Sequence, residues 1–190
     1  LLKDFTLGKD GDFKEKRLIE IVNNDLANTI GNLLNRTISM SRKWYSNSVP
    51  VLNTKNILEH KLMLYASQEI KNYISAMTAL EIQKATVTII NLATNANIYL
   101  NDTAPWKSIK QDVNQEIVSN DIYCILDTCR IIGVMLVPLL PEYSKKILSQ
   151  LSTEISISEW KKNLYPAKLV EGIKLADPTP IISKIDKIIS

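Results

Sequence analysis

Hydrophobic residues recur along the chain with the three-to-four-residue spacing of amphipathic helices, and strictly alternating runs are few. Only five glycines interrupt the 190 residues. The pattern predicts an all-α fold, a helix bundle of about five main helices followed by a less regular C-terminal tail. The buried stripe expected for the first helix consists of Leu18, Val22, Leu26, Ile30, Leu33 and Thr37.

Capping and turn signals bound these predicted helices. Asp12 with Glu15, and Thr78 with Glu81, have the spacing of capping boxes, which begin helices. Pro141 is typical of a first helical turn. The predicted elements are helices over about Asp12–Tyr45, Thr54–Met77, Thr78–Leu100, Gln111–Leu136 and Pro141–Leu151, a short helix over Ser158–Asn163 and an amphipathic stretch over Ile181–Ile189.

Composition places the chain among globular domains. With 45% hydrophobic residues it can bury a sizeable core, and with a net charge of +3 any nucleic-acid contact must come from a local patch. No run approaches the roughly 20 apolar residues of a membrane span, and the N-terminus does not resemble a signal peptide. We therefore expect a cytoplasmic protein without membrane contact. The start at Leu1, without an initiator methionine, suggests a piece of a longer protein.

Candidate catalytic and metal-binding residues are scarce. His60 is the only histidine, which excludes metal sites built on several imidazoles, and we expect it on the surface. Cys124 and Cys129 lie in an apolar run and are expected to be reduced core residues. Asp121 and Asp127 have no evident polar pocket around them. We therefore expect no catalytic residue, no metal and no cofactor in this chain.

One polar stripe stands out on the first predicted helix. Asn24, Asn28, Asn32 and Arg36 follow one another at steps of four residues, with Asn35 beside them. Amide and guanidinium groups can hydrogen-bond to base edges, and a guanidinium also stacks on a base plane. On spacing alone, however, a structural role is favoured, in which Asn28 and Asn32 cap backbone or bridge helices within the bundle.

Pro105 and Trp106 lie where the third predicted helix ends. Proline fixes the backbone, and the neighbouring indole could stand out as a platform for an unpaired base. The alternative is an indole folded onto the core. For Trp44 and Trp160 we expect the core position, whereas for Trp106 the sequence leaves both open.

The segment Asn23–Arg36 closely resembles the anticodon-domain signature of methionyl-tRNA synthetases, which are class I aminoacyl-tRNA synthetases. Further matches follow in family order and cover nearly the whole chain. The tail segment Asp177–Asp186 resembles a family segment in degenerate form, without its Phe-Pro-Arg triplet. The further matches are Lys9–Phe13, Asn97–Tyr99 leading to Ala104–Trp106, and Val137–Glu142.

The resemblance implies a bundle that binds the CAU anticodon of methionine tRNA. Residues matching Asn32, Arg36, Pro105 and Trp106 would contact the anticodon, with Trp106 stacked on the first base and Asn32 and Arg36 on base edges. Secondary contacts would come from Asn28 and Asn35. The implied partners are this tRNA and the catalytic domain of the same polypeptide, and ATP and methionine would be substrates of the full-length enzyme.

The resemblance also suggests how the chain is divided. Residues 1–12 would link to the missing catalytic domain, 13–151 would form the anticodon-binding bundle, and 152–190 would be a tail that packs on the bundle or on the catalytic domain. Two alternatives remain open. One is the bundle of another class I synthetase, and the other is a helical protein-interaction module whose asparagines only order the packing of helices.

Overall fold

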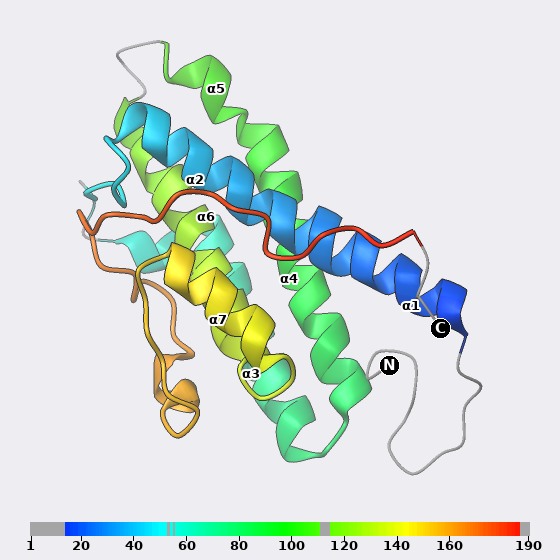
Figure 1. Cartoon of the computed structure of the whole chain (residues 1–190). Coiled ribbons are helices and arrows are strands. Elements are labelled where there is room, and N and C mark those ends of the chain that lie inside the picture. The colour runs from blue at the N-terminus through cyan, green and yellow to red at the C-terminus, as the bar shows by residue number, and fades with distance from the viewer. Residues whose placement is uncertain (1–13, 53, 55, 111–114, 187–190) are drawn as a thin grey trace.

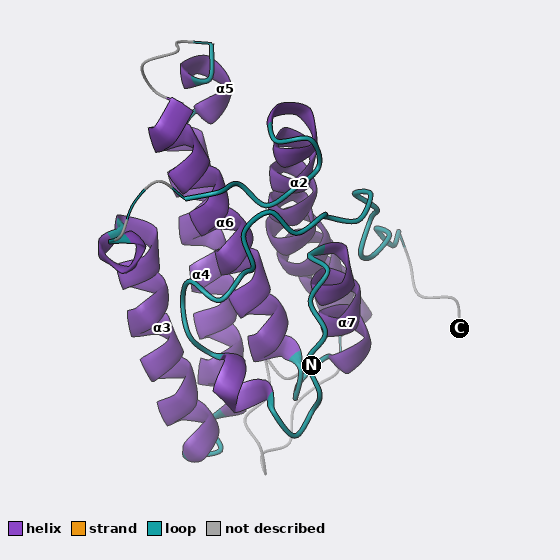
Figure 2. Cartoon of the chain, turned by 90° about the vertical axis from the view of Figure 1, so that its left-hand side faces the viewer, coloured by secondary structure: helices purple, strands orange, loops and turns teal. Residues whose placement is uncertain are grey.

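The computed structural model describes residues 14–52, 54, 56–110 and 115–186. Long helices lie side by side along most of the chain (Figure 1), and the described residues contain no strand (Figure 2). The predicted all-α bundle is confirmed. Its elements are α1 (Glu15–Ile21), η1 (Val22–Gly31), α2 (Asn32–Trp44), η2 (Ile57–Glu59), α3 (Lys61–Thr78), α4 (Ile82–Thr103), α5 (Pro105–Ser108), α6 (Gln115–Leu136), α7 (Pro141–Gln150) and η4 (Trp160–Asn163).

The first long helix is continuous from α1 through η1 into α2, and it ends at Trp44, as the pattern predicted to within one residue. The cap expected at Asp12 lies outside the described residues. The sequence did not reveal that η1 is a π-helix of ten residues, a wider coil in which backbone groups pair five residues apart. Its last turn is closed by the Asn32 N–H, which donates to the Ala27 carbonyl.

The second and third helices begin later than predicted. Residues 56–60 form a loop with one tight turn, and α3 starts after His60, whose Nδ1 caps it by accepting the Leu62 N–H at 3.3 Å. Leu58, which the prediction placed within the second helix, lies in this loop and is 55% exposed. The proposed capping box of Thr78 and Glu81 is wrong. Thr78 ends α3, because the chain turns at Leu80 with a φ of 58° before α4 begins.

The later elements follow the prediction in part. The helix α7 begins at Pro141 as expected, and α6 is described from Gln115, so its predicted start at Gln111 lies outside the described residues. The expected short helix near residue 160 is a single tight turn, η4. Residues 181–186 are not helical, and the rest of that predicted amphipathic stretch is outside the described residues. The short helix α5 was not predicted.

The core is centred on α6, which contacts α2, α3, α4, α5, α7 and η4. Nearly every residue of α6 from Val118 to Leu136 is buried. Cys124 and Cys129 are free thiols within this helix, as predicted, and burial raises the pKa of both. No described helix has the length and apolar character that crossing a membrane requires.

The described part of the tail returns across the bundle and runs along α2 and α1 (Figure 1). Side chains of the bundle hold its backbone at several places. The Asn23 amide donates to the carbonyl of Ile185 at 2.8 Å and accepts the Ile185 N–H at 3.0 Å. The Gln150 amide makes the same pair of bonds with Thr179. These paired bonds fix the tail on the helices.

A buried ion pair makes a further attachment. Asp127 and Arg130 are 2.6 Å apart in α6, and their side chains are 0% and 2% exposed. The carboxylate also accepts backbone N–H groups from residues 167–169, and the guanidinium donates to the carbonyls of Asn163 and Tyr165. The sequence had shown no polar partner for Asp127. The tail supplies those partners, so the ion pair and the conformation of the tail stabilise each other.

Candidate functional site

The exposed face of α2 carries the first two predicted site residues. Leu33, Leu34, Thr37 and Ile38 point into the core, which leaves Asn32 and Arg36 on the outer face one turn apart. Within the part of the chain that the structure describes, the Asn32 side chain makes no hydrogen bond. Its amide donors and carbonyl acceptor are therefore available to a ligand.

The neighbouring turn presents Trp106. The helix α4 ends at Thr103, and the next residue, Ala104, adopts the left-handed conformation with a φ of 40°. Pro105 then begins α5 as its first residue, with its ring buried, while Trp106 is 37% exposed. The turn thus anchors the proline and leaves part of the indole in solvent.

Arg36 and Trp106 lie together in space although 70 positions separate them in the sequence. The Arg36 guanidinium lies over the indole, with its carbon 5.6 Å from the ring centroid, a cation–π contact. It also donates to the Asn101 side-chain oxygen at 3.0 Å. Asn101 belongs to the last turn of α4, just beyond Leu100, where the sequence had predicted that this helix ends. The structure adds it to the site as the residue that holds the guanidinium.

The other asparagines in and around the stripe differ in role. Asn28 and Asn35 are half-buried, and neither side chain makes a hydrogen bond within the described residues. The bridging role that spacing had favoured for Asn28 and Asn32 belongs instead to two others. Asn23 binds the tail, and Asn97 of α4 donates to the Thr29 carbonyl of η1 at 2.9 Å.

The other two tryptophans occupy structural positions, as predicted. Trp44 and Trp160 are half-buried and pack against the core. Trp160 meets Tyr73 edge-on, with ring centroids 6.0 Å apart.

A partly buried polar cluster of His60, Tyr99 and Asp121 corrects the surface position expected for His60. The Nε2 atom of His60 is 3.1 Å from Asp121 and 3.0 Å from the Tyr99 hydroxyl, which donates to Asp121 at 2.5 Å. Burial, then the hydrogen bond and the charge of Asp121, raises the pKa of Tyr99. Because His60 Nδ1 accepts the Leu62 N–H, the neutral ring carries its proton on Nε2 and donates to Asp121. The cluster ties α3, α4 and α6 together.

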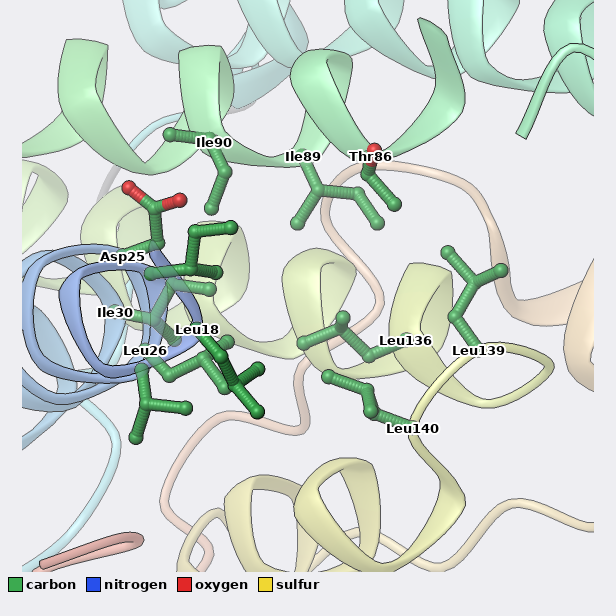
Figure 3. A pocket seen from close by; sticks show the side chains of 12 residues that line it. Leu18, Asp25, Leu26, Ile30, Thr86, Ile89, Ile90, Leu136, Leu139 and Leu140 are labelled. Atoms are coloured by element: carbon green, nitrogen blue, oxygen red, sulfur yellow. The ribbon is translucent and has the colours of Figure 1, made fainter. Parts of the chain in front are cut away.

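An apolar pocket of about 380 Å³ lies beside η1 (Figure 3). Aliphatic side chains make up most of its wall, with Asp25 and Thr86 as the polar exceptions. Such a wall has few hydrogen-bonding groups with which to read a nucleotide base. The lining residues are Leu18, Ile21, Val22, Asp25, Leu26, Ile30, Thr86, Ile89, Ile90, Leu136, Leu139 and Leu140.

Two protein-family models match the chain. The model described as the anticodon binding domain of methionyl tRNA ligase matches residues 49–188. The model of class I tRNA synthetases for methionine matches residues 1–38. The second match ends within α2, and the first begins at residue 49, after α2 has ended at Trp44.

Curated relatives are similar over nearly the whole chain. The methionine–tRNA ligase of Rickettsia conorii is 34% identical over 98% of this chain and 37% of that protein. The corresponding ligase of Synechocystis is 36% identical over 88% of this chain and 31% of that protein. The chain thus spans less than two-fifths of the length of these relatives.

Solved structures show the same fold. The apo form of Mycobacterium tuberculosis methionyl-tRNA synthetase superposes with a TM-score of 0.87 and 24% identity, over 98% of this chain and 38% of that one. The same enzyme bound by methionyl-adenylate gives a TM-score of 0.84 and 25% identity, over 95% and 36%.

Proposed function

Because the chain belongs to the family of anticodon-binding domains of methionyl-tRNA ligases, we propose that Asn32, Arg36, Pro105 and Trp106 form a surface that reads the CAU anticodon of methionine tRNA. The observation that carries the proposal is the contact of Arg36 with Trp106. This contact brings together the exposed ring of Trp106 and the planar guanidinium of Arg36. The amide of Asn32, which makes no hydrogen bond within the described residues, lies one helical turn away. Single-stranded loops are recognised by this combination of stacking and edge contacts.

Each group has a distinct role in the proposed complex. The indole of Trp106 stacks on the first anticodon base, with Pro105 fixing the turn that presents it. Arg36, held by Asn101, and Asn32 hydrogen-bond to base edges. Arg36 already lies over one face of the indole, so the base uses the face that remains open. Asn28 and Asn35, at the border of this surface, make secondary contacts.

The proposal extends to the longer protein of which this chain would form part. There, a catalytic domain would use ATP and methionine to charge the tRNA in the cytoplasm, and this chain would select the tRNA. Residues 1–12 would join the catalytic domain to the bundle of 13–151, and residues 152–190 would form the tail. The family match over residues 1–38 supports a direct junction at this end.

A titration tests the function directly. The chain is titrated with an anticodon stem-loop carrying CAU and with the same stem-loop carrying a changed first base, and tryptophan fluorescence is followed. We expect tighter binding and stronger quenching with CAU, because stacking and edge contacts depend on the base. Equal affinity for all loops, or no binding at all, would contradict the proposal and favour a structural or protein-binding bundle.

Changes at Asn32 and Arg36 test base reading. Asn32→Ala is expected to lower the preference for CAU over altered loops about tenfold, since a hydrogen bond to a base edge is lost. Arg36→Lys keeps the charge but loses the planar fork, and it should reduce the same preference. Affinities for a panel of loops provide the measurement.

Lys43→Gln serves as the matched control, because Lys43 is an exposed cation at the end of the same helix. Its loss should weaken all loops equally or not at all. If Asn32→Ala behaved in the same way, with uniform weakening, Asn32 would not read a base.

A further inference from the structure

We propose that Tyr143 and Asn97 are positioning residues for anticodon reading, because they hold the π-helical turn from which Asn32 emerges. The inference rests on the proposed function of Asn32. Neither residue belongs to the exposed surface formed by Asn32, Arg36 and Trp106. Tyr143 is 7% exposed in α7, and Asn97 is half-buried in α4.

The position of Asn32 depends on the π-helical geometry directly. Its own N–H donates to the Ala27 carbonyl, five residues back, so Asn32 closes the last wide turn of η1. In an α-helix, each backbone N–H would instead bond to the carbonyl four residues back. This shift of the acceptor by one residue corresponds to about 100° of rotation around the helix axis. A side chain at this junction changes its direction whenever the pairing changes.

Gly31 shows how closely the wide turn is fitted. A Cβ atom at Gly31 would lie 3.1 Å from the Leu26 carbonyl oxygen, five residues back. That distance is tighter than ordinary van der Waals contact. Because Gly31 has no side chain, the Leu26 carbonyl can lie this close to it. The carbonyl must stay in this position for the wide turn to persist.

Two neighbouring helices hold the carbonyls of η1. The Tyr143 hydroxyl donates to the Leu26 carbonyl at 2.5 Å. The Asn97 amide donates to the Thr29 carbonyl at 2.9 Å and to the Ala93 carbonyl of its own helix at the same distance. Both carbonyls belong to the last six residues of η1, so α4 and α7 grip the turn that ends at Asn32.

Packing alone does not fix this segment. Ile30 is the only buried residue of η1, and α1 has none. The apolar pocket of Figure 3 lies directly beside η1, and Leu26 and Ile30 are part of its wall. With open space on this side, the side-chain hydrogen bonds carry much of the restraint on the wide turn.

The chain contains matched controls for a test. Tyr73, Tyr123 and Tyr143 are all buried, and each donates its hydroxyl to a backbone carbonyl of another segment. Only the Tyr143 bond reaches η1, because Tyr73 binds Met135 and Tyr123 binds Leu169. Tyrosine-to-phenylalanine changes remove one oxygen and keep the ring in each case.

The experiment compares Tyr143→Phe with Tyr123→Phe and Tyr73→Phe. We expect Tyr143→Phe to lower the preference for the CAU stem-loop over altered loops roughly two- to tenfold, the effect of one lost hydrogen bond. Hydrogen exchange at the amides of residues 27–32 should become faster in the same variant. The two controls should leave both the preference and this exchange unchanged, whatever they do to thermal stability.

Asn97→Leu tests the second contact in the same two measurements, so the inference does not depend on one variant. If both variants keep the wild-type preference and the wild-type exchange of residues 27–32, the positioning role is wrong and the proposed function stands. If the wild-type chain itself shows no preference for CAU, the proposed function fails. The exchange data then still report whether Tyr143 and Asn97 hold the π-helical turn.

Discussion

Asp127→Ala is expected to lower the free energy of unfolding by about 3–5 kcal/mol, the largest effect of any substitution considered for this chain. The change leaves the Arg130 guanidinium buried without its counter-ion, and Arg130 is only 2% exposed. It also removes the acceptor for the backbone N–H groups of residues 167–169. The melting temperature should fall by roughly 6–20 °C, as measured by calorimetry or circular dichroism.

A surface ion pair provides the control. Arg42 and Asp177 also join a bundle helix to the tail, but their side chains are 54% and 71% exposed. Asp177→Asn should therefore change the free energy of unfolding by less than about 1 kcal/mol. Similar effects of the two substitutions would show that burial of the Asp127 pair does not determine its contribution, and that the tail is held mainly by other contacts.

The sequence predicted the first long helix well because one physical signal dominates it. Apolar positions at helical spacing identified the first long helix to within one residue of its end at Trp44. The start of α3 was misplaced because residues near Leu58 continue the apolar spacing, although the chain there is a loop and the helix begins only after its cap, His60. The π-helical geometry of η1 could not be predicted from the sequence. Over only ten residues, the spacing of apolar positions scarcely distinguishes backbone hydrogen bonds between residues four apart from those between residues five apart.

The candidate site was predictable to a similar degree. Asn32 and Arg36 share a helical face, and that much follows from their spacing. Their neighbours come from distant segments. Asn101 lies 65 positions from Arg36, and Asp121 lies 61 positions from His60. Contacts of this kind depend on how the helices pack, which periodicity does not encode. Asp127 seemed to have no polar partner for the same reason.

Trp106→Ala should weaken binding of the CAU stem-loop about 5- to 150-fold, the equivalent of 1–3 kcal/mol for one stacked base. The loss should be greatest for loops with cytosine first, because that base is the proposed stacking partner. Stability should hardly change, since the indole is 37% exposed and its contact with Arg36 is a surface cation–π interaction. Affinity and melting temperature are measured on the same samples.

Trp160→Ala supplies the reverse control. Trp160 is half-buried and packs against Tyr73, so its removal should lower the melting temperature and leave stem-loop affinity unchanged. The two tryptophans then separate the roles that the sequence had left open for Trp106. If Trp106→Ala caused the drop in stability and spared binding, the indole would be a structural residue, and stacking would have to be assigned to another part of the surface. We expect Trp106→Ala to affect binding and Trp160→Ala to affect stability. When the Trp106 ring is removed, the buried Pro105 and the left-handed turn at Ala104 still keep the backbone in place.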